Sequence, residues 1–227
     1  MVTAHPDDVD FGAAGTVALL GASGATVSYC VVTDGTAGGF DRSVGRDEIA
    51  AIRRREQRSA AAHVNVTDVV FLGRQDGAVV ADFALRRAIA REIRRVQPEL
   101  VITQSPERNY ERLPASHPDH RAVGDAALSA VYPDARNPFA FPELLEEGLE
   151  PHIVPEVWLM AHPEPTLAVD VTAVLETKFA AIGAHESQLP DPEQVRRRVA
   201  SRTAHDAVRL GLNEGSHAEV FKVIRLD

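Results

Sequence analysis

Short runs of apolar residues alternate along this chain with longer segments in which apolar positions recur at the helical period. The short runs, rich in Val and Ile, predict strands at Val27–Thr33, Val69–Leu72, Leu100–Thr103, Val157–Met160, Leu167–Val171 and Glu219–Arg225. The longer segments predict helices at Gly12–Leu20, Arg46–His63, Asp82–Val96, His120–Val131, Ala173–Ala184 and Glu193–Leu210. Strands and helices that alternate in this way are typical of βαβ units, so we expect an α/β fold around a mostly parallel sheet.

The organisation of the chain is that of one domain. Neither an internal repeat nor a low-complexity linker divides its 227 residues, so we predict a single domain over residues 1–227. Two segments, Gln104–Pro118 and Tyr132–Pro155, match neither pattern because they are long, polar and interrupted by proline. Loops of that length in a compact domain are usually functional or mobile.

Charge and composition exclude several classes of function. The chain carries 24 Lys and Arg against 33 Asp and Glu, a formal net charge of −9, and 5% of its residues are aromatic. An acidic chain with few aromatics is unsuited to phosphate contacts and base stacking, so we expect no nucleic-acid partner. We therefore expect the protein to act on a small molecule. The oligomeric state is left open, with a homo-oligomer among the options.

The sequence also indicates a protein of the cytoplasm. The uncharged stretch Phe11–Thr33 is long enough to cross a bilayer, but several glycines interrupt it, so we predict no membrane span. The first residues lack the basic region and apolar core of a signal peptide. The single cysteine, Cys30, lies in an apolar run, which predicts a buried structural thiol and a reducing compartment.

Two similar clusters carry the candidate chemistry. His5-Pro6-Asp7-Asp8 follows four residues that we expect to form a short first strand, and His117-Pro118-Asp119-His120 ends the first long loop. Ligands collect at the strand ends of an open parallel sheet. His5 and Asp8 can point at one cation while Asp7 faces the open coordination side. Two histidines and a carboxylate with an open position suit catalytic zinc or another divalent ion.

Helix capping is the competing interpretation of both clusters. Asp7 or Asp8 could accept hydrogen bonds from the first amides of the helix that follows, and the second cluster could cap its own helix in the same way. Two H-P-D clusters at successive junctions between loop and helix are harder to explain by capping alone, so the pattern favours a metal site.

The chain resembles the LmbE-like, or PIG-L, family of zinc-dependent N-deacetylases, which includes N-acetylglucosaminyl deacetylases. The two H-P-D clusters carry the resemblance, and further landmarks follow in the expected order: Thr33-Asp34-Gly35, Arg53-x-x-Glu56, Phe71-Leu72-Gly73 with Asp76, Lys178, His185-x-Ser187-Gln188 and Ala218-Glu219-x-Phe221. The resemblance implies a Rossmann-like, three-layer α/β/α fold. Only Met1–Ala4 precede His5 where the family has a full strand, so we expect a shortened first strand.

The resemblance also implies a role for each candidate residue. It implies zinc as the cofactor, with His5, Asp8 and His120 as ligands, and Asp7 as the general base. It implies that His117 stabilises the oxyanion or protonates the leaving amine, that Asp119 orients an imidazole, and that Arg53 and Asp76 bind sugar hydroxyls. Without the resemblance, Arg53 is a solvent-facing helix residue and Asp76 a turn residue.

These roles predict a hydrolase that removes an N-acyl group, first of all N-acetyl, from a small-molecule amino sugar or sugar conjugate. A thiol-conjugate amidase or a deacylase of a secondary metabolite would use the same chemistry. A non-catalytic metal-binding protein is the alternative from a different class, and Asp7 counts against it because the metal does not need that residue. A phosphate-ester or nucleic-acid hydrolase would need a basic groove or a second metal.

Three further features are assigned to structure. We predict that His185 lies at a helix end, and that Lys178 extends along the surface with its ammonium group in water. The run Arg196-Arg197-Arg198 is expected to form a solvated helix face, with binding of an anionic partner as the alternative.

Overall fold

A seven-stranded, mostly parallel sheet forms the centre of the molecule, which we describe over residues 1–226 from a computed structural model. The strand order is β3-β2-β1-β4-β5-β7-β6. The first five strands run parallel, whereas β7 is antiparallel to both of its neighbours. The strands are β1 (Val2–Thr3), β2 (Ser28–Thr33), β3 (Asp68–Arg74), β4 (Leu100–Gln104), β5 (Glu156–Met160), β6 (Leu167–Asp170) and β7 (Ala218–Arg225).

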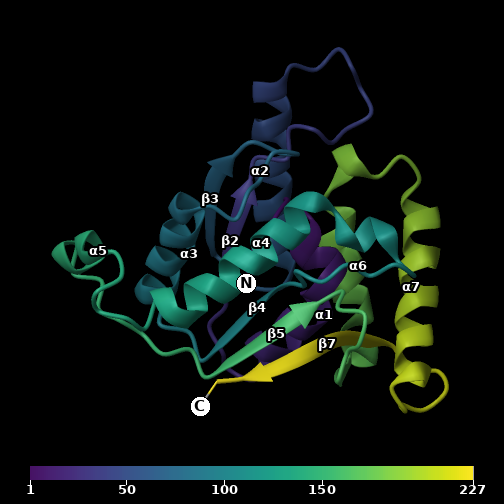
Figure 1. Cartoon of the computed structure of the whole chain (residues 1–227). Coiled ribbons are helices and arrows are strands. Elements are labelled where there is room, and N and C mark those ends of the chain that lie inside the picture. Colours follow the sequence, from purple (N-terminus) through teal and green to yellow (C-terminus); the bar gives the residue numbers. More distant parts are fainter. Residues whose placement is uncertain (227) are drawn as a thin grey trace.

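Helices cover both faces of this sheet (Figure 1). They are α1 (Asp8–Ala22), α2 (Arg46–His63), α3 (Phe83–Val96), α4 (Pro118–Ser129), α5 (Pro142–Glu146), α6 (Leu175–Gly183) and α7 (Pro192–Arg209). One core packs α3 and α4 against one face, and further cores pack α1, α2 and α6 against the other. The predicted three-layer α/β/α fold is confirmed. Among the helices of residues 1–226, none combines the length and the apolar composition of a membrane-spanning segment.

The alternation of side chains along β2 explains how one strand serves both cores. Cys30 and Val32 pack on the side of α3 and α4, whereas Tyr29 packs on the side of α1 and α2. This is the period of two expected of a strand that is buried on both faces. Cys30 is buried as predicted, and burial raises the pKa of its thiol to about 12, so the thiol stays protonated and unreactive.

One predicted boundary needs correction, and one segment left unassigned contains a helix. The first helix begins at Asp8 rather than Gly12, so the second aspartate of the first cluster already belongs to α1. The prediction started later because the polar residues Asp8 and Asp10 interrupt the apolar pattern of the first turn, although Val9 between them is buried in the core. The segment 132–155, which matched no pattern, contains α5, a helix of 5 residues that is too short to show a period.

The strand order places both clusters at one edge of the sheet. Chain connections reverse direction between β1 and β4, which is where open α/β sheets bind their ligands. His5 follows β1, and the loop after β4 leads to the second cluster at the start of α4. Gly124 lets α4 lie directly on β4, since a Cβ there would be 2.2 Å from the Gln104 carbonyl oxygen.

Candidate active site

The first cluster forms a tight turn between β1 and α1. Asp7 has a φ of 96°, a left-handed conformation that is unusual for a residue with a side chain. Its side chain makes no capping hydrogen bond to α1, so the capping interpretation is wrong for Asp7. The Asp8 carboxylate instead accepts a hydrogen bond from the backbone N–H of His5, at 2.6 Å. The Asp7 carboxylate is therefore not used to cap α1, and the Asp8 carboxylate bonds back to the first residue of the cluster.

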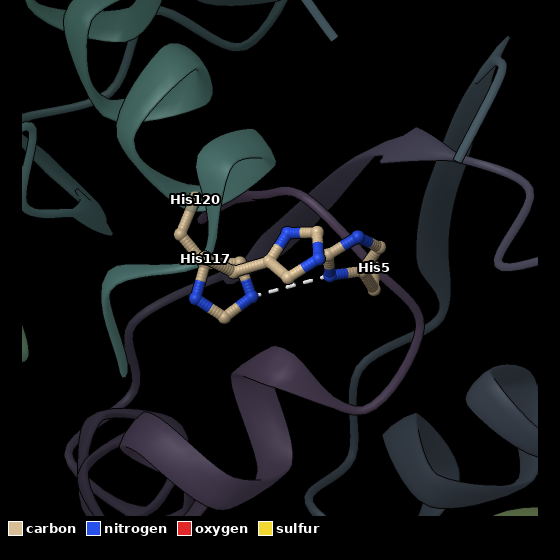
Figure 2. A group of neighbouring side chains, drawn as sticks. All are labelled: His5, His117 and His120. Atoms are coloured by element: carbon tan, nitrogen blue, oxygen red, sulfur yellow. Dashed lines mark hydrogen bonds between the residues drawn. The ribbon is translucent and has the colours of Figure 1, made fainter. Parts of the chain in front are cut away.

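Side chains of the two clusters meet in space although more than a hundred residues separate them. His5 Nδ1 lies 3.2 Å from His120 Nε2, and Asp8 lies 3.0 Å from His120 Nε2 and 3.3 Å from His5 Nδ1. Figure 2 shows the rings of His5, His117 and His120 gathered together, with a dashed line between His5 and His120. The structure thus brings the three predicted ligands, His5, Asp8 and His120, to one point.

The spacing of these donor atoms fits a small divalent cation. Ligand atoms about 2.1 Å from a tetrahedral zinc ion lie roughly 3.4 Å apart. The distances among His5 Nδ1, His120 Nε2 and the Asp8 carboxylate are 3.0 to 3.3 Å, close to that value. Two imidazoles and one carboxylate are donors that suit zinc and its transition-metal neighbours. The residues present therefore fit the cofactor that the sequence predicts.

Two further carboxylates lie on the other side of the His5 ring. His5 Nε2 is 3.1 Å from Asp76 Oδ1 and 3.3 Å from Asp119 Oδ2. Burial alone would lower the pKa of His5, but its hydrogen bonds to Asp76 and Asp8 outweigh burial and raise that pKa to about 11. The carboxylates therefore favour positive charge at this point. Carboxylates that accept from the outer nitrogen of a ligating imidazole fix its orientation.

Asp119 and Asp76 are themselves held by backbone amides. Asp119 accepts hydrogen bonds from the N–H groups of Gly77 and Val79, at 2.7 and 3.2 Å, and its side chain is almost completely buried. Asp76 accepts from the N–H of Ala37 at 2.9 Å. The loop after β3 is thereby tied to the start of α4. The predicted contact of Asp76 with a sugar hydroxyl stays a prediction, since the structure places this carboxylate against His5.

Arg53 is buried beneath Asp7 rather than exposed on the surface of α2. The Nη2 group of Arg53 donates to Asp7 Oδ2 at 2.9 Å and to the carbonyl of Pro6. Its Nη1 group donates to the carbonyl of Gly35 at 3.0 Å. The solvent-facing interpretation of Arg53 is therefore wrong, because α2 turns this face toward the site. Burial raises the pKa of Asp7 to about 6 although the guanidinium opposes that shift.

Gln57 lies one helical turn after Arg53 and holds the backbone of Asp7. Its Oε1 accepts from the Asp7 N–H at 2.8 Å, and its Nε2 donates to Asp10 Oδ2 at 2.9 Å. His185 Nε2 lies 2.8 Å from the same oxygen of Asp10. Sequence analysis missed Gln57 and Asp10. The spacing of four residues between Arg53 and Gln57, which puts both on one face of a helix, is the signal that could have identified Gln57.

Lys178 is fully buried, so the prediction of a lysine extending to water is wrong. Its ammonium group lies 2.6 Å from Glu219 Oε1 and donates to the carbonyls of Asp10 and Phe11, at 2.9 and 3.0 Å. Close packing of α6 on α1 leaves the side chain no path to solvent, and a buried charge requires a partner. His185 lies just beyond α6, as predicted, and is also buried.

His117 caps α4 through its ring. The backbone N–H of Asp119 donates to His117 Nδ1 at 3.2 Å, so capping does apply to this residue. An accepting Nδ1 leaves the ring proton on Nε2. Burial and the neighbouring His5 and His120 lower the pKa of His117, which favours the neutral ring. His117 is therefore set to donate a hydrogen bond from Nε2.

A cleft of about 490 Å³ opens beside the clustered histidines. Asp8 and His120 line this cleft together with residues of α7, of the loop after β4 and of the ends of β5 and β7. Its volume lies within the range of small-molecule sites, about 300–1,000 Å³. The segment 104–118, which the sequence left unassigned, thus forms part of the wall of the cleft.

Comparison with known proteins agrees with this geometry. The profile of the family described as PIG-L, GlcNAc-PI de-N-acetylase, matches residues 1–131, which include both H-P-D clusters. The chain belongs to this family. It is 33% identical over 187 residues to diacetylchitobiose deacetylase of Thermococcus kodakarensis, covering 82% of this chain and 68% of that protein. It is 30% identical over 199 residues to a probable N-acetyl-alpha-D-glucosaminyl L-malate deacetylase 2 of Bacillus cereus, covering 83% and 82%.

A solved structure of a deacetylase is similar to this chain over nearly its whole length. N,N'-diacetylchitobiose deacetylase of Pyrococcus horikoshii superposes with a TM-score of 0.90 at 30% identity, over 99% of this chain and 82% of that one. The predicted family and the predicted class of enzyme, a hydrolase of amide bonds, are confirmed.

Proposed function

We propose that this PIG-L protein is a metal-dependent N-deacetylase of small glycosides that contain N-acetylglucosamine. The observation that carries the proposal is the convergence of His5, Asp8 and His120 at mutual distances of 3.0 to 3.3 Å beside a cleft. The names of the relatives support the substrate class, because they describe deacetylases of diacetylchitobiose and of a glucosaminyl malate. Both substrates join an acetylated glucosamine to a second group.

His5, Asp8 and His120 would hold the cation, for which zinc is our first choice. A divalent cation in such a site polarises an amide carbonyl and lowers the pKa of water toward about 7. Asp76 and Asp119 orient the imidazole of His5 through its outer nitrogen. Asp8 and His120 line the cleft, so a cation held there would be accessible to substrate, as expected of a catalytic rather than a structural centre.

Asp7 is the proposed general base, which takes a proton from the attacking water. Its left-handed backbone turns the carboxylate away from α1, and the ion pair with Arg53 at 2.9 Å fixes the direction of that carboxylate. Arg53 thus acts through Asp7, and a direct contact with a sugar hydroxyl is the second part of its proposed role. A carboxylate with a pKa near 6 is a stronger base than an ordinary aspartate.

His117 is proposed to stabilise the oxyanion of the tetrahedral intermediate. Its Nδ1 is occupied by the amide of Asp119, so a neutral ring presents N–H from Nε2 toward the site. Protonation of the departing amine by the acid form of Asp7 then completes the cycle, since one group serves as base and acid in turn.

Two broader proposals accompany this one. We assign residues 1–227 to one domain, because the strands of a single sheet extend from β1 to β7. The cytoplasm is the proposed compartment, supported by a lone cysteine that is buried and unpaired within the described residues.

Release of primary amine tests the proposed function. Protein stripped with a chelator and then reloaded with one equivalent of zinc is incubated with N-acetylglucosamine glycosides. We expect amine release from the reloaded protein and none from the stripped protein. Full activity without metal, or no release from any glycoside by the zinc-loaded protein, would contradict the proposal.

A further inference from the structure

One face of α7 carries a stripe of basic residues. Arg198, Arg202, His205 and Arg209 follow one another at intervals of four, three and four residues, which places them along a single side of the helix. Like charges four residues apart on a helix, such as Arg198 and Arg202, repel each other. Such a stripe in a chain of net charge −9 therefore calls for a role.

The stripe faces the cleft beside the proposed metal site. Arg202, His205 and Arg209 line the same cleft as Asp8 and His120, and Arg198 borders an adjoining hollow together with Arg202 and His205. The helix therefore turns its basic side toward the proposed substrate.

A hydrogen bond fixes how far the stripe lies from the metal ligands. The Arg202 guanidinium donates to the carbonyl of Phe11 at 2.9 Å. Phe11 lies one helical turn after Asp8 in α1, so this guanidinium lies about one turn from a proposed metal ligand. The stripe is thus close enough to contact a group attached to the reacting sugar.

Positive charge is in excess at this end of the cleft. Within residues 1–226, neither Arg202 nor Arg112, which also lines the cleft, forms an ion pair, and Arg209 pairs with Asp206 at 3.1 Å. The carboxylates that face this end are Asp206 and Glu111, since Glu219 is held by Lys178. Burial and the nearby Arg112 lower the pKa of Arg202 to about 10, and the nearby Asp206 and Glu219 oppose that shift.

We propose that Arg112 and Arg202, with Arg209 beside them, form a subsite for an oxyanion on the group linked to the amino sugar. This inference rests on the proposed function and narrows its substrates to glycosides whose second group carries a carboxylate or a phosphate. Guanidinium groups bind such oxyanions through paired N–H donors. The run Arg196-Arg197-Arg198, expected to form a solvated face, leads into this surface at one end.

Three matched glycosides of N-acetylglucosamine test the subsite. The carboxymethyl glycoside carries a carboxylate, the carbamoylmethyl glycoside is its neutral isostere, and the 2-phosphoethyl glycoside carries a phosphate. With the zinc-loaded enzyme, we expect kcat/KM for the preferred anionic glycoside to exceed that for the neutral one by about tenfold. Added salt should reduce this ratio, because it screens the arginines. The two anionic glycosides show which oxyanion fits.

Variants assign the preference to the arginines. Arg202→Met and, separately, Arg112→Met should bring the ratio of the anionic to the neutral glycoside close to one. Arg196→Met is the matched control, because Arg196 lies on the same helix and pairs with Glu176, and neither residue lines the cleft. This control should keep the wild-type ratio. A wild-type ratio near one for both anionic glycosides would overturn the proposal.

Calorimetry separates failure of the subsite from failure of the enzyme. The three glycosides are titrated into the zinc-loaded Asp7→Asn protein, which we expect to bind without turnover. Preferential binding of an anionic glycoside, together with no amine release by the wild type, would refute the proposed function and support the subsite. Deacetylation of all three glycosides at equal rates, with equal binding, would refute the subsite and support the function.

Discussion

At the scale of single residues, the site depends on a backbone conformation that an aspartate does not favour. A residue with a side chain held at positive φ costs about 1–3 kcal/mol, and surrounding contacts must maintain it. Asp7 has a φ of 96°, and Gln57 and Arg53 supply those contacts from α2. The direction of the proposed base is therefore set by a helix that begins almost forty residues later in the chain.

Gln57→Leu should lower kcat more than it changes KM. The substitution removes the acceptor for the Asp7 N–H, so the turn relaxes and the carboxylate moves away from the attacking water. A displacement of about 1 Å at a reacting group costs roughly a hundredfold in rate. Steady-state kinetics and zinc analysis measure the effect, with one zinc expected in both proteins. An unchanged kcat would show that Gln57 does not position Asp7.

Asp76→Ala separates two roles for that carboxylate. Because Asp76 accepts from the outer nitrogen of His5, its loss should weaken zinc binding about 10- to 100-fold. Competition with a chromogenic chelator measures that affinity. A normal zinc affinity with a strongly raised KM would instead support the contact with a sugar hydroxyl that the sequence suggested.

The sequence predicted the donor types of the site well, and its finer geometry poorly. The two H-P-D clusters at strand ends predicted that their histidines and carboxylates meet at one metal site, and the resemblance to the PIG-L family selected His5, Asp8 and His120 among them. Which nitrogen of His5 faces the carboxylates depends on a rotamer and on the loop after β3, which no local pattern specifies. The sequence did not predict the burial of Arg53 either. Arg53 lies among other charged residues of α2, and such a run does not show which face of the helix packs against the loops of the site.

At the scale of elements, the site depends on close packing between α4 and β4. A Cβ at position 124 would lie 2.2 Å from the Gln104 carbonyl oxygen, so only glycine allows this approach. The helix begins with the second cluster, and its position on the sheet therefore determines where His120 lies.

Gly124→Ala should destabilise the protein and weaken metal binding together. Overpacking of this kind costs about 1–3 kcal/mol, and movement of α4 away from β4 carries His120 with it. Denaturant unfolding gives the change in free energy, and chelator competition gives the zinc affinity. Gly183→Ala in α6 is the matched control, because nothing lies within 4 Å of its new Cβ. We expect the control to leave zinc binding unchanged, and an equal loss in both variants would contradict the argument.

Helices with a regular pattern of apolar residues were predicted with accurate bounds, whereas the bounds of elements that begin with site residues were not. The bounds Arg46–His63 predicted for α2 match the structure at both ends. The first turn of α1 lay outside its prediction because Asp8 serves the site rather than the core. The prediction for Lys178 was wrong for a different reason. Its burial results from the packing of α6 on α1, and the sequence of α6 alone does not predict that packing.

At the scale of the whole molecule, the strand order creates the site. Reversal of the connections between β1 and β4 brings the ends of these strands together, and the clusters that follow them converge there. The sheet places α7 along the cleft, so the C-terminal part of the chain lines the space in which substrate is proposed to bind. Residues of the proposed metal site and of the proposed oxyanion subsite therefore line one cleft.

The most direct test of the account is turnover and metal content of the Asp7→Asn protein. Asparagine keeps the size of the side chain but cannot accept the proton of the attacking water, and Asp7 is not one of the proposed ligands. We predict one bound zinc per chain and amine release at least about a hundredfold slower than in the wild type. Turnover at the wild-type rate with zinc bound would contradict the assignment of Asp7 as the general base.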